Sequence, residues 1–283
     1  MAIGVPGCPE FACWTASMDS VRMVLTDRVA KSVGMVPLTW YTVAGKQTMA
    51  PEVIVDKPAE LPETLARRFT EEAERAIAGR GRFSVALPGG SVATSFFPRL
   101  ARSGVDWSRT HFFWGDERAV PPADPESNFG LARSMWFDPA GVPAAQIHRM
   151  EADAADPQAA AARYSDAMVR LLGSPPVIDL VLLGVGPDGH VCSLFPGHPL
   201  LAEESRFVAV VDDSPKPPPR RLTLTMPVLA AAGLVVVAAT GSSKAAVLRE
   251  ALEQPDSSLP LALVVRRARR CLFLLDEATG VRS

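Results

Sequence analysis

Residues 178–190 read IDLVLLGVGPDGH, and this stretch decides the fold class. Its first part, Ile178–Leu183, is an apolar run, which is typical of a β-strand that is buried on both faces. Its second part is a glycine-rich turn that holds Asp188 and His190. A strand with two apolar faces needs cover above and below, so the stretch predicts a parallel or mixed sheet with helices on both sides.

The rest of the chain alternates between strand and helix patterns around this strand. Further strands are expected over residues 53–55, 83–87, 110–114, 207–211, 222–225, 234–239 and 271–275, and helices over 59–78, 91–102, 127–135, 157–172 and 242–252. Pro98 is expected to kink or shorten its helix. Ser214–Pro219 is expected to be a surface loop, because proline does not fit a central strand. In a sheet of this kind, ligands bind outside the carboxyl ends of the strands.

The composition limits the class of protein. The chain has 283 residues, of which 48% are hydrophobic and 21% charged, a balance typical of globular proteins. The net charge of −2 provides no field for binding nucleic acid or an anionic membrane, so neither partner is expected. The uncharged stretch Leu222–Ser243 is long, but Pro227 and Gly233 interrupt it and favour strand, short helix and strand over a membrane span.

The cysteine pattern predicts reduced thiols, and the N-terminal segment is predicted to be an extension of the folded unit. The four cysteines form neither a CxxC pair nor a metal-binding spacing: Cys8, Cys13, Cys192 and Cys271. The last two are interpreted as reduced thiols, so a cytoplasmic protein is expected. Residues 1–48 show little periodicity apart from a helix expected over 20–33. We interpret them as an extension that is either disordered or an upstream mis-start, before a folded unit over residues 49–283.

Two of the turns that follow expected strands suit an anion. Gly89, Gly90 and Ser91 precede a helix, where glycine allows close backbone approach and the helix N-terminus offers free N–H groups. A plain strand-to-helix turn has the same pattern. The turn 240–244 also opens a helix, and Lys244 fits a phosphate as a point charge. An N-cap serine beside a surface lysine is the simpler alternative for this second turn.

Two further turns carry acid and base groups. Arg118, in the turn 115–118, suits bidentate contacts with phosphate or carboxylate. A solvated charged loop has the same composition. In the turn 184–190, three glycines surround Asp188 and His190. A neutral imidazole is a good general base near neutral pH, and a carboxylate beside it can orient the ring.

The remaining candidate groups are interpreted mainly as structural. Cys192, close to His190, leaves open a cysteine nucleophile, although only the histidine is near enough in sequence to activate it. His111, His148 and His198 are expected to pack within the fold. The arginine cluster over residues 266–270 is expected to be a solvated loop between strands.

Five segments, in this order along the chain, resemble the 6-phosphogluconolactonase family, within a wider group that includes the glucosamine-6-phosphate deaminases. The segments are LPGGS at 87–91, WGDERAVPPADPESNFG at 114–130, DLVLLGVGPDGHVCSLFPGHP at 179–199, SPKPPPRRLTLTMPVL at 214–229 and ATGSSKAAVL at 239–248. The resemblance covers about residues 51–280. It implies a three-layer α/β/α fold with a modified Rossmann-like, mostly parallel sheet. It also implies hydrolysis of 6-phospho-D-glucono-1,5-lactone in the pentose phosphate pathway, without a metal or organic cofactor.

The resemblance also implies roles for individual residues. His190 takes the place of the base that activates water, with Asp188 beside it, and Asp116 takes a place suited to contacting sugar hydroxyls. The expected phosphate-binding groups are Gly89, Gly90, Ser91, Arg118 and Lys244, with Arg221 as a second positive charge. The expected partner is a small phosphosugar lactone, bound by a monomer or a homodimer.

Two alternatives stay open at this point. A deaminase typically has Asp-Glu-Tyr where this chain has residues 116–118, and Asn-Glu-Pro where it has Leu194-Phe195-Pro196. The missing glutamate removes an acid that ring opening needs, which disfavours a deaminase or isomerase. A non-catalytic sugar-phosphate-binding protein would keep the phosphate-binding groups but would not need Asp188 and His190.

Overall fold

The structure is a computed structural model that describes residues 40–43 and 46–282. Most of the expected N-terminal extension, including the helix expected over 20–33, lies outside the described residues. Trp40–Val43 (β1) and Lys46–Met49 (β2) pair as an antiparallel two-stranded sheet. The folded unit expected from residue 49 therefore begins at the last residue of a strand.

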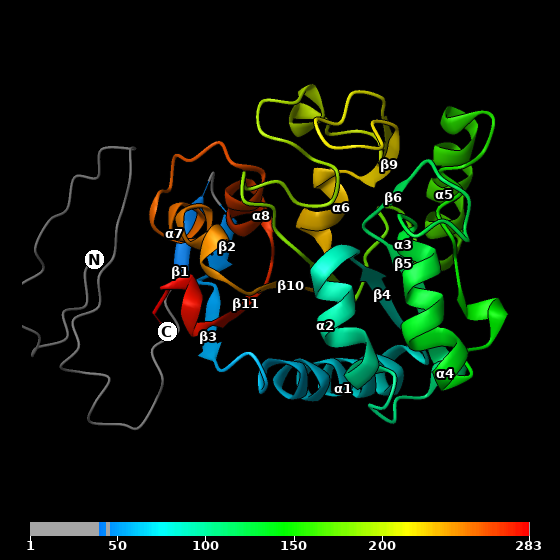
Figure 1. The fold of residues 1–283 in the computed structure, drawn as a ribbon, viewed down its shortest axis with the longest axis horizontal. Coiled ribbons are helices and arrows are strands. Elements are labelled where there is room, and N and C mark those ends of the chain that lie inside the picture. The colour runs from blue at the N-terminus through cyan, green and yellow to red at the C-terminus, as the bar shows by residue number, and fades with distance from the viewer. Residues whose placement is uncertain (1–39, 44–45, 283) are drawn as a thin grey trace, which may run out of the picture. The chain divides into compact units, whose positions relative to one another are not determined.

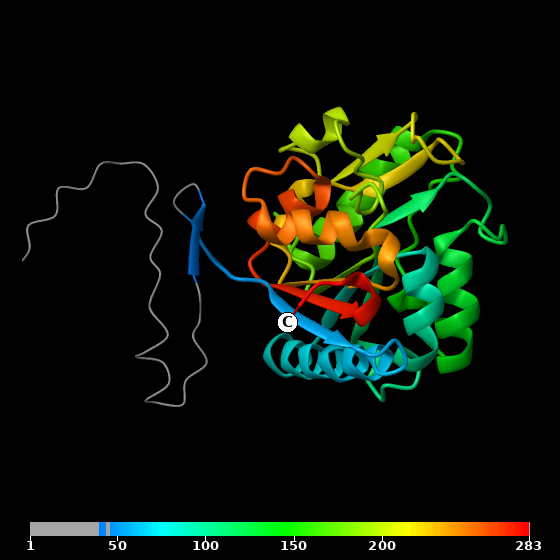
Figure 2. The ribbon, with the colours of Figure 1, turned by 60° about the vertical axis from the view of Figure 1, so that its left-hand side comes forward.

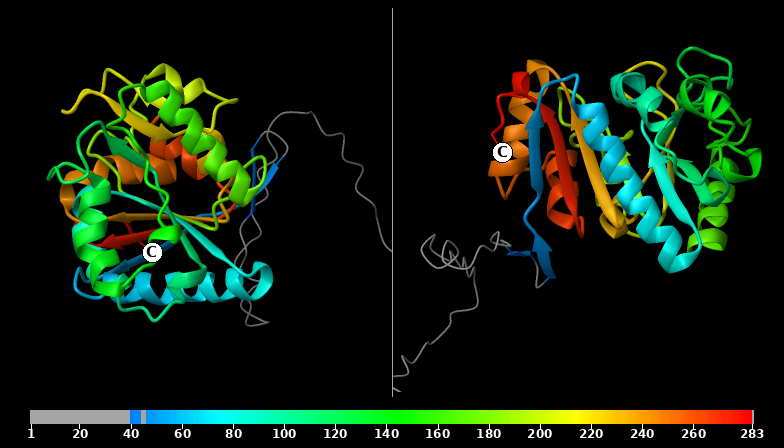
Figure 3. Two further views of the ribbon diagram at one scale, coloured as in Figure 1. Left: turned by 90° about the vertical axis from the view of Figure 1, so that its right-hand side faces the viewer. Right: turned by 90° about the horizontal axis from the view of Figure 1, so that it is seen from below.

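The main sheet has six parallel strands in the order β3-β11-β10-β7-β4-β5. Their bounds are Glu52–Asp56 (β3), Phe83–Leu87 (β4), Thr110–Trp114 (β5), Leu180–Leu183 (β7), Leu234–Ala239 (β10) and Cys271–Asp276 (β11). In this order the first strand of the sheet, β3, lies beside the last, β11 (Figure 3). The parallel sheet predicted from the apolar strand patterns is confirmed.

Helices cover both faces of this sheet and complete three layers. Their bounds are Leu61–Arg80 (α1), Gly90–Leu100 (α2), Asn128–Ala132 (α3), Asp138–Ala140 (α4), Pro157–Leu172 (α5), Met226–Ala231 (α6), Ala245–Glu253 (α7) and Pro260–Arg267 (α8). Figure 2 shows α1 below the sheet and α7 and α8 above it. The predicted three-layer α/β/α fold is confirmed.

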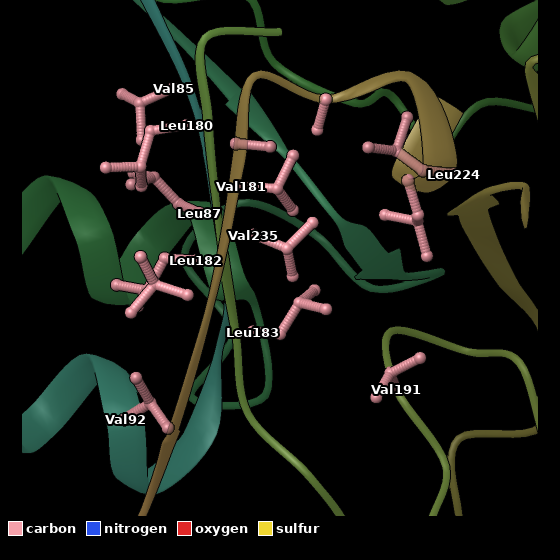
Figure 4. Close-up of a cluster of buried hydrophobic side chains, with 14 of the residues drawn as sticks. Val85, Leu87, Val92, Leu180, Val181, Leu182, Leu183, Val191, Leu224 and Val235 are labelled. Atoms are coloured by element: carbon pink, nitrogen blue, oxygen red, sulfur yellow. The ribbon is translucent and has the colours of Figure 1, made fainter. Parts of the chain in front are cut away.

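The central strand β7 explains why its sequence is apolar at successive positions. Successive side chains of a strand point to opposite faces of the sheet. Leu180 and Leu182 point toward the side where Val92 of α2 lies, whereas Val181 and Leu183 point to the other side (Figure 4). All four β7 residues are buried. Burying a leucine or valine side chain contributes about 1.5–3 kcal/mol, so both helix layers gain stability from this one strand.

A smaller antiparallel sheet of three strands continues from the end of β5 (Figure 1). It contains Asp116–Arg118 (β6), Val208–Val211 (β8) and Arg221–Leu224 (β9). The backbone N–H of Leu224 donates to the carbonyl of Gly115 at 2.8 Å, which connects β9 to the end of β5. The stretch 222–243 thus folds as strand, helix α6 and strand β10, as predicted. In the described part of the chain, no helix is long and apolar enough to cross a membrane.

Three local predictions were wrong. The arginine cluster at 266–270 is not simply a loop, because Arg266 and Arg267 form the last turn of α8 and Arg270 bonds to Glu72 of α1. Residues 116–118 are a strand rather than a turn, since they pair with β9. The helix expected over 127–135 is divided, because α3 passes into a wider π-helical turn over Arg133–Phe137. The helix with Pro98, α2, ends at Leu100, slightly earlier than expected.

Candidate active site

A cavity of about 160 Å³ lies at the carboxyl ends of β4, β5 and β7. Its walls are the turns that follow these strands, together with the start of α3 and the start of β9. The lining residues are Pro88, Gly89, Gly90, Ser91, Val92, Gly115, Asp116, Arg118, Asn128, Leu182, Leu183, Gly184, Val185, Gly186, His190, Cys192 and Arg221. The fold thus brings three of the four predicted turns together at one site.

Most of the site residues predicted from the sequence meet at this cavity. Seven line it: Gly89, Gly90, Ser91, Asp116, Arg118, His190 and Arg221. Asp188 is not among the lining residues, but it is hydrogen-bonded to His190, which is. Lys244 is not part of the lining; it ends the single helical turn Ser242–Lys244 after β10, the strand next to β7.

Asp276 holds the turn that carries Lys244. This buried carboxylate at the end of β11 accepts hydrogen bonds from the backbone N–H of Gly241 at 2.9 and 3.0 Å. Burial lowers the pKa of Lys244, and the Asp276 carboxylate acts in the opposite direction. This contact could not be predicted from the sequence, because β10 and β11 become neighbours only in the folded sheet.

Asp188 and His190 form a hydrogen-bonded pair. Oδ1 of Asp188 lies 2.5 Å from Nδ1 of His190. An ionised carboxylate only accepts hydrogen bonds, so Nδ1 carries the proton and Nε2 presents a lone pair. Gly186 lies directly beside the pair and its N–H donates to the His190 carbonyl at 3.0 Å. The pair therefore has the arrangement of a general base with a carboxylate that orients it.

The charge state of His190 depends on several neighbours. Burial lowers the pKa of His190, Asp188 raises it, Lys216 lowers it and Asp116 raises it, and the net direction is downward. The ring also packs on Phe195, with the ring centroids 4.9 Å apart. A lowered pKa keeps the imidazole neutral and able to accept a proton near neutral pH.

Lys216 is a site residue that the sequence analysis missed. Its Nζ lies 3.4 Å from Oδ1 of Asp188 and 3.2 Å from Nδ1 of His190. The proline-rich segment around it was expected to be a surface loop, which it is, but the loop lies against the Asp188–His190 pair. The segment stood among the family motifs, and that was the one signal available in the sequence.

Glu117 fixes the shape of the cavity wall without lining it. This buried carboxylate accepts hydrogen bonds from the backbone N–H groups of Arg118, Asn128 and Phe129 at 2.7–2.8 Å. Ser127 Oγ donates to it as well. Burial raises the pKa of Glu117, and the backbone N–H groups oppose this effect. The carboxylate thereby joins β6 to the start of α3.

Arg118 lines the cavity and keeps one buried donor unpaired among the described residues. Its Nη1 donates to the carbonyl of Glu126 at 2.6 Å, but its buried Nε has no hydrogen-bond partner among the described residues. The start of α2 also lines the cavity, and this helix begins at Gly90 with no side-chain cap, so its first N–H groups have no partner within the helix. An anionic group of a ligand would satisfy both sets of donors.

Asp116 and Arg221 both line the cavity, and both are buried. Oδ2 of Asp116 accepts from Ser193 Oγ at 2.6 Å and lies 3.9 Å from Nη1 of Arg221. The Asp116 carbonyl accepts from Nδ2 of Asn128 at 2.9 Å. Asp116 is thus fixed on two sides and keeps its other carboxylate oxygen, Oδ1, for a ligand.

Cys192 lacks the features of a nucleophile although it lines the cavity. Burial and the charge of Asp116 raise its pKa well above the usual range of a thiol. Its backbone has a φ of 50°, and its Sγ packs so closely on Gly115 that a Cβ there would lie 2.9 Å away. The thiolate that nucleophilic attack requires is therefore disfavoured.

The other histidines do not line the cavity. Nδ1 of His111 lies 3.1 Å from Nε2 of His148, and His198 contacts Asp213 and accepts from the N–H of Leu200. Their expected packing roles are therefore confirmed. Within residues 50–282, no group of three or more His, Cys, Asp or Glu side chains is arranged to hold a metal ion.

Comparison with known proteins identifies the family. The family described as glucosamine-6-phosphate isomerases/6-phosphogluconolactonase matches residues 56–273. The chain is 42% identical over 236 residues to the 6-phosphogluconolactonase of Rattus norvegicus. This alignment covers 80% of this chain and 91% of the rat protein. It is 36% identical over 240 residues to that of Synechocystis sp., which covers 82% and 98%. The solved 6-phosphogluconolactonase from Trypanosoma cruzi has a TM-score of 0.74 and 27% identity, and covers 82% of this chain and 97% of that chain. The chain therefore belongs to the glucosamine-6-phosphate isomerase/6-phosphogluconolactonase family.

Proposed function

We propose that this chain hydrolyses 6-phospho-D-glucono-1,5-lactone to 6-phosphogluconate in the pentose phosphate pathway, with His190 as general base. The observation that carries the proposal is the Asp188–His190 pair, with a 2.5 Å contact, at a cavity that the uncapped N-terminus of α2 also lines. The pair supplies a base and the helix end supplies donors for an anion. The curated relatives from Rattus norvegicus and Synechocystis sp. are named 6-phosphogluconolactonases, which supports the proposed reaction.

The chemistry follows from which atoms of His190 are free. Nδ1 is engaged with Asp188, so Nε2 takes a proton from a water molecule as the water oxygen attacks the lactone carbonyl. The carbonyl oxygen becomes an oxyanion, which backbone N–H groups of the glycine-rich turns stabilise. The bond from the carbonyl carbon to the ring oxygen then breaks, and the imidazolium returns its proton to the ring oxygen.

The phosphate is the anchor that holds the lactone in position. We assign it to the turn 89–91 at the start of α2 and to Arg118, whose buried Nε is without a partner among the described residues. Lys244 is the third group, because the turn that carries it follows β10, next to β7. Asp116 is assigned to the sugar hydroxyls. Contacts remote from the reacting carbon supply binding energy that fixes its orientation.

The test is lactone hydrolysis by the wild-type chain, by His190→Ala and by a blank without enzyme, because this lactone also hydrolyses spontaneously. The lactone is generated in place from glucose 6-phosphate, and the product is followed with a coupled dehydrogenase. Acceleration that His190→Ala abolishes supports both the reaction and its base. Acceleration that survives in His190→Ala contradicts the base but not the reaction.

No acceleration by folded wild-type protein would contradict the proposed reaction and favour the deaminase or the non-catalytic alternative. Ammonia release from glucosamine 6-phosphate separates these two. The residues at the place of the deaminase glutamate speak against it: Leu194 and Phe195 are both buried and apolar.

We propose a cytoplasmic location for the reaction. Cys192 and Cys271 are both free cysteines, as is usual in a reducing compartment. Cell fractionation with an antibody to the chain tests the location, and recovery of the chain in an organelle fraction contradicts it.

A further inference from the structure

The loop 214–219, which carries Lys216, has few groups of its own to fix its shape. Four of its six residues are proline, so they have no backbone N–H to donate. Three internal hydrogen bonds involve Ser214: its N–H donates to the Pro219 carbonyl at 3.1 Å, its Oγ donates to the Lys216 carbonyl at 2.8 Å, and the Lys216 N–H donates to its Oγ at 3.2 Å. The loop therefore depends on donors from outside.

Arg221, at the start of β9, supplies these donors. Its Nη2 donates to the carbonyls of Lys216 at 2.9 Å and Pro217 at 3.3 Å, and its Nε donates to the carbonyl of Pro218 at 3.2 Å. The guanidinium is buried, and it lies 5.9 Å from the ring centre of Phe195. Since Nε and Nη2 are engaged by the loop, only Nη1 is directed elsewhere, toward Asp116.

The loop in turn places one ammonium group against the proposed catalytic pair. Nζ of Lys216 lies within 3.4 Å of both Oδ1 of Asp188 and Nδ1 of His190. Lysine has a long, flexible side chain, so its ammonium group stays at this position only if the backbone below it is fixed.

We propose that Arg221 is a positioning residue rather than a phosphate ligand: it holds the backbone of loop 214–219 so that the Lys216 ammonium remains beside Asp188 and His190. This inference rests on the proposed role of His190 as base. It revises the expectation that Arg221 adds a second positive charge to the substrate phosphate.

The arrangement has an electrostatic consequence for the base. Burial contributes most to the lowered pKa of His190, Asp188 and Asp116 raise the pKa, and Lys216 opposes the two carboxylates. Lys216 also shares Oδ1 of Asp188 with the imidazole, so it weakens the attraction of that carboxylate for a proton on the ring. Asp188 can then orient His190 without converting it to an imidazolium, which cannot act as a base.

The test is a direct titration of His190 by NMR in the free protein, where no substrate phosphate titrates. The chain has only four histidines, so the His190 ring signal is assigned by its absence in His190→Ala. The variants are Lys216→Met, Arg221→Gln, Arg221→Lys and the double variant Lys216→Met/Arg221→Gln. Arg220→Gln is the matched control. Arg220 is the residue next to Arg221, but its side chain is exposed and its Nε donates to Oδ1 of Asp212 at 2.7 Å.

We expect Lys216→Met to raise the pKa of His190 by about 1 unit, because one nearby positive charge is removed. Arg221→Gln is expected to shift it in the same direction, and the double variant is expected to match Lys216→Met rather than the sum of the two shifts. A direct effect of the Arg221 charge would persist in the Lys216→Met background. Arg221→Lys, which keeps the charge beside Asp116 but loses the planar fork, is expected to resemble Arg221→Gln. Arg220→Gln should titrate like the wild type.

Steady-state kinetics gives the second readout. If Arg221 positions Lys216, its variants lower kcat/KM most at acid pH, by about tenfold for a shift of one unit, and raise KM little. If Arg221 binds the phosphate instead, they raise KM for the lactone at every pH and leave the His190 titration unchanged, which overturns the inference. Thermal melts show which variants fold; if Arg221→Gln does not, Arg221→Lys carries the test.

This result is separable from the proposed function. Failure of the base assignment appears as activity in His190→Ala, whereas failure of the positioning role appears as an unshifted His190 titration in the Arg221 variants.

Discussion

Gly186 and His190 are packed so closely that a Cβ atom on residue 186 would lie 2.1 Å from Nδ1 of the imidazole. The same Cβ would lie 2.4 Å from Oδ1 of Asp188. Gly186 has no positive φ, so its backbone does not require glycine. The space that the Asp188–His190 pair occupies is what requires it.

Gly186→Ala is therefore expected to damage activity more than folding. The added methyl group must displace the ends of two side chains, and a misplacement of about 1 Å in the site costs about 10²-fold in kcat/KM. The cost in stability is about 1–3 kcal/mol, as for other overpacked sites. Lactonase kinetics and thermal melts check the two effects separately. Gly79→Ala is the control, because a Cβ at Gly79 meets nothing within 4 Å. Wild-type kinetics in Gly186→Ala would contradict the described packing.

Glu117→Gln is expected to lower both stability and activity. In the wild type, the carboxylate accepts hydrogen bonds from the surrounding N–H and O–H donors. The amide of the variant replaces one accepting oxygen with an NH₂ group, and each buried donor left unsatisfied costs about 1–3 kcal/mol. Arg118 follows directly in β6, so KM for the lactone should rise as well. Chemical denaturation and steady-state kinetics check this.

Glu126→Gln is the matched control for that change. Glu126 is an exposed residue whose side chain lies 3.3 Å from Nη1 of Arg118, and loss of such a pair is expected to change stability by about 0.5 kcal/mol or less. Equal effects of the two substitutions would show that the hydrogen bonds from Asn128 and Phe129 to Glu117 do not stabilise the start of α3.

Cys192→Ala is expected to retain activity within about threefold of the wild type, which is less than 1 kcal/mol in the barrier. The raised pKa of Cys192 leaves almost no thiolate near neutral pH, so the cavity cysteine contributes contacts rather than chemistry. In the wild-type chain, Cys192 should react slowly with an alkylating reagent. A loss of activity as large as that of His190→Ala would restore the cysteine nucleophile as a candidate.

Stability is expected to fall between pH 6.5 and about 4 because of His148. Burial and the neighbouring His111 lower the pKa of His148 to about 4 in the folded state. Below pH 6.5 the unfolded chain therefore binds more protons at this residue than the folded chain, and acid favours unfolding. The loss is complete once the pH falls through the folded pKa. Above pH 6.5 both states are neutral there and the stability is retained.

His148→Gln is the variant that checks this pH dependence. It should flatten the fall of the melting temperature between pH 6.5 and 4, whatever its effect at pH 8. A melting curve for His148→Gln that follows the wild type across this range would contradict the assignment.

The sequence predicted what local pattern determines. The apolar run at β7 and the glycine turns after β4 and β7 were found because strand burial and turn chemistry leave a mark on neighbouring residues. Lys216 was missed because its role arises from a contact across 26 positions in sequence, within a proline-rich loop that looks like any surface loop. Glu117 was missed for a related reason: a charged residue after a strand does not reveal that it accepts a hydrogen bond from a helix start eleven positions later.

The predicted boundaries of helices and strands were wrong where tertiary contacts override the local sequence pattern. The arginines after Val265 are charged, which predicts a loop, but α8 extends through Arg267. Its last backbone hydrogen bond runs from the N–H of Ala268 to the Val264 carbonyl. Residues 116–118 were read as a turn, and pairing with β9, distant in sequence, makes them a strand.

The position of β3 beside β11 has a consequence for folding during synthesis on the ribosome. Val53 pairs with Phe273, so synthesis of the partner follows 220 residues after the first strand. At about 5–20 residues per second, the nascent β3 waits roughly 10–40 s before its neighbour exists. Until then its backbone donors and acceptors are an open edge, available to other chains. Pairing of β3 with the sheet is therefore possible only after translation has passed β11.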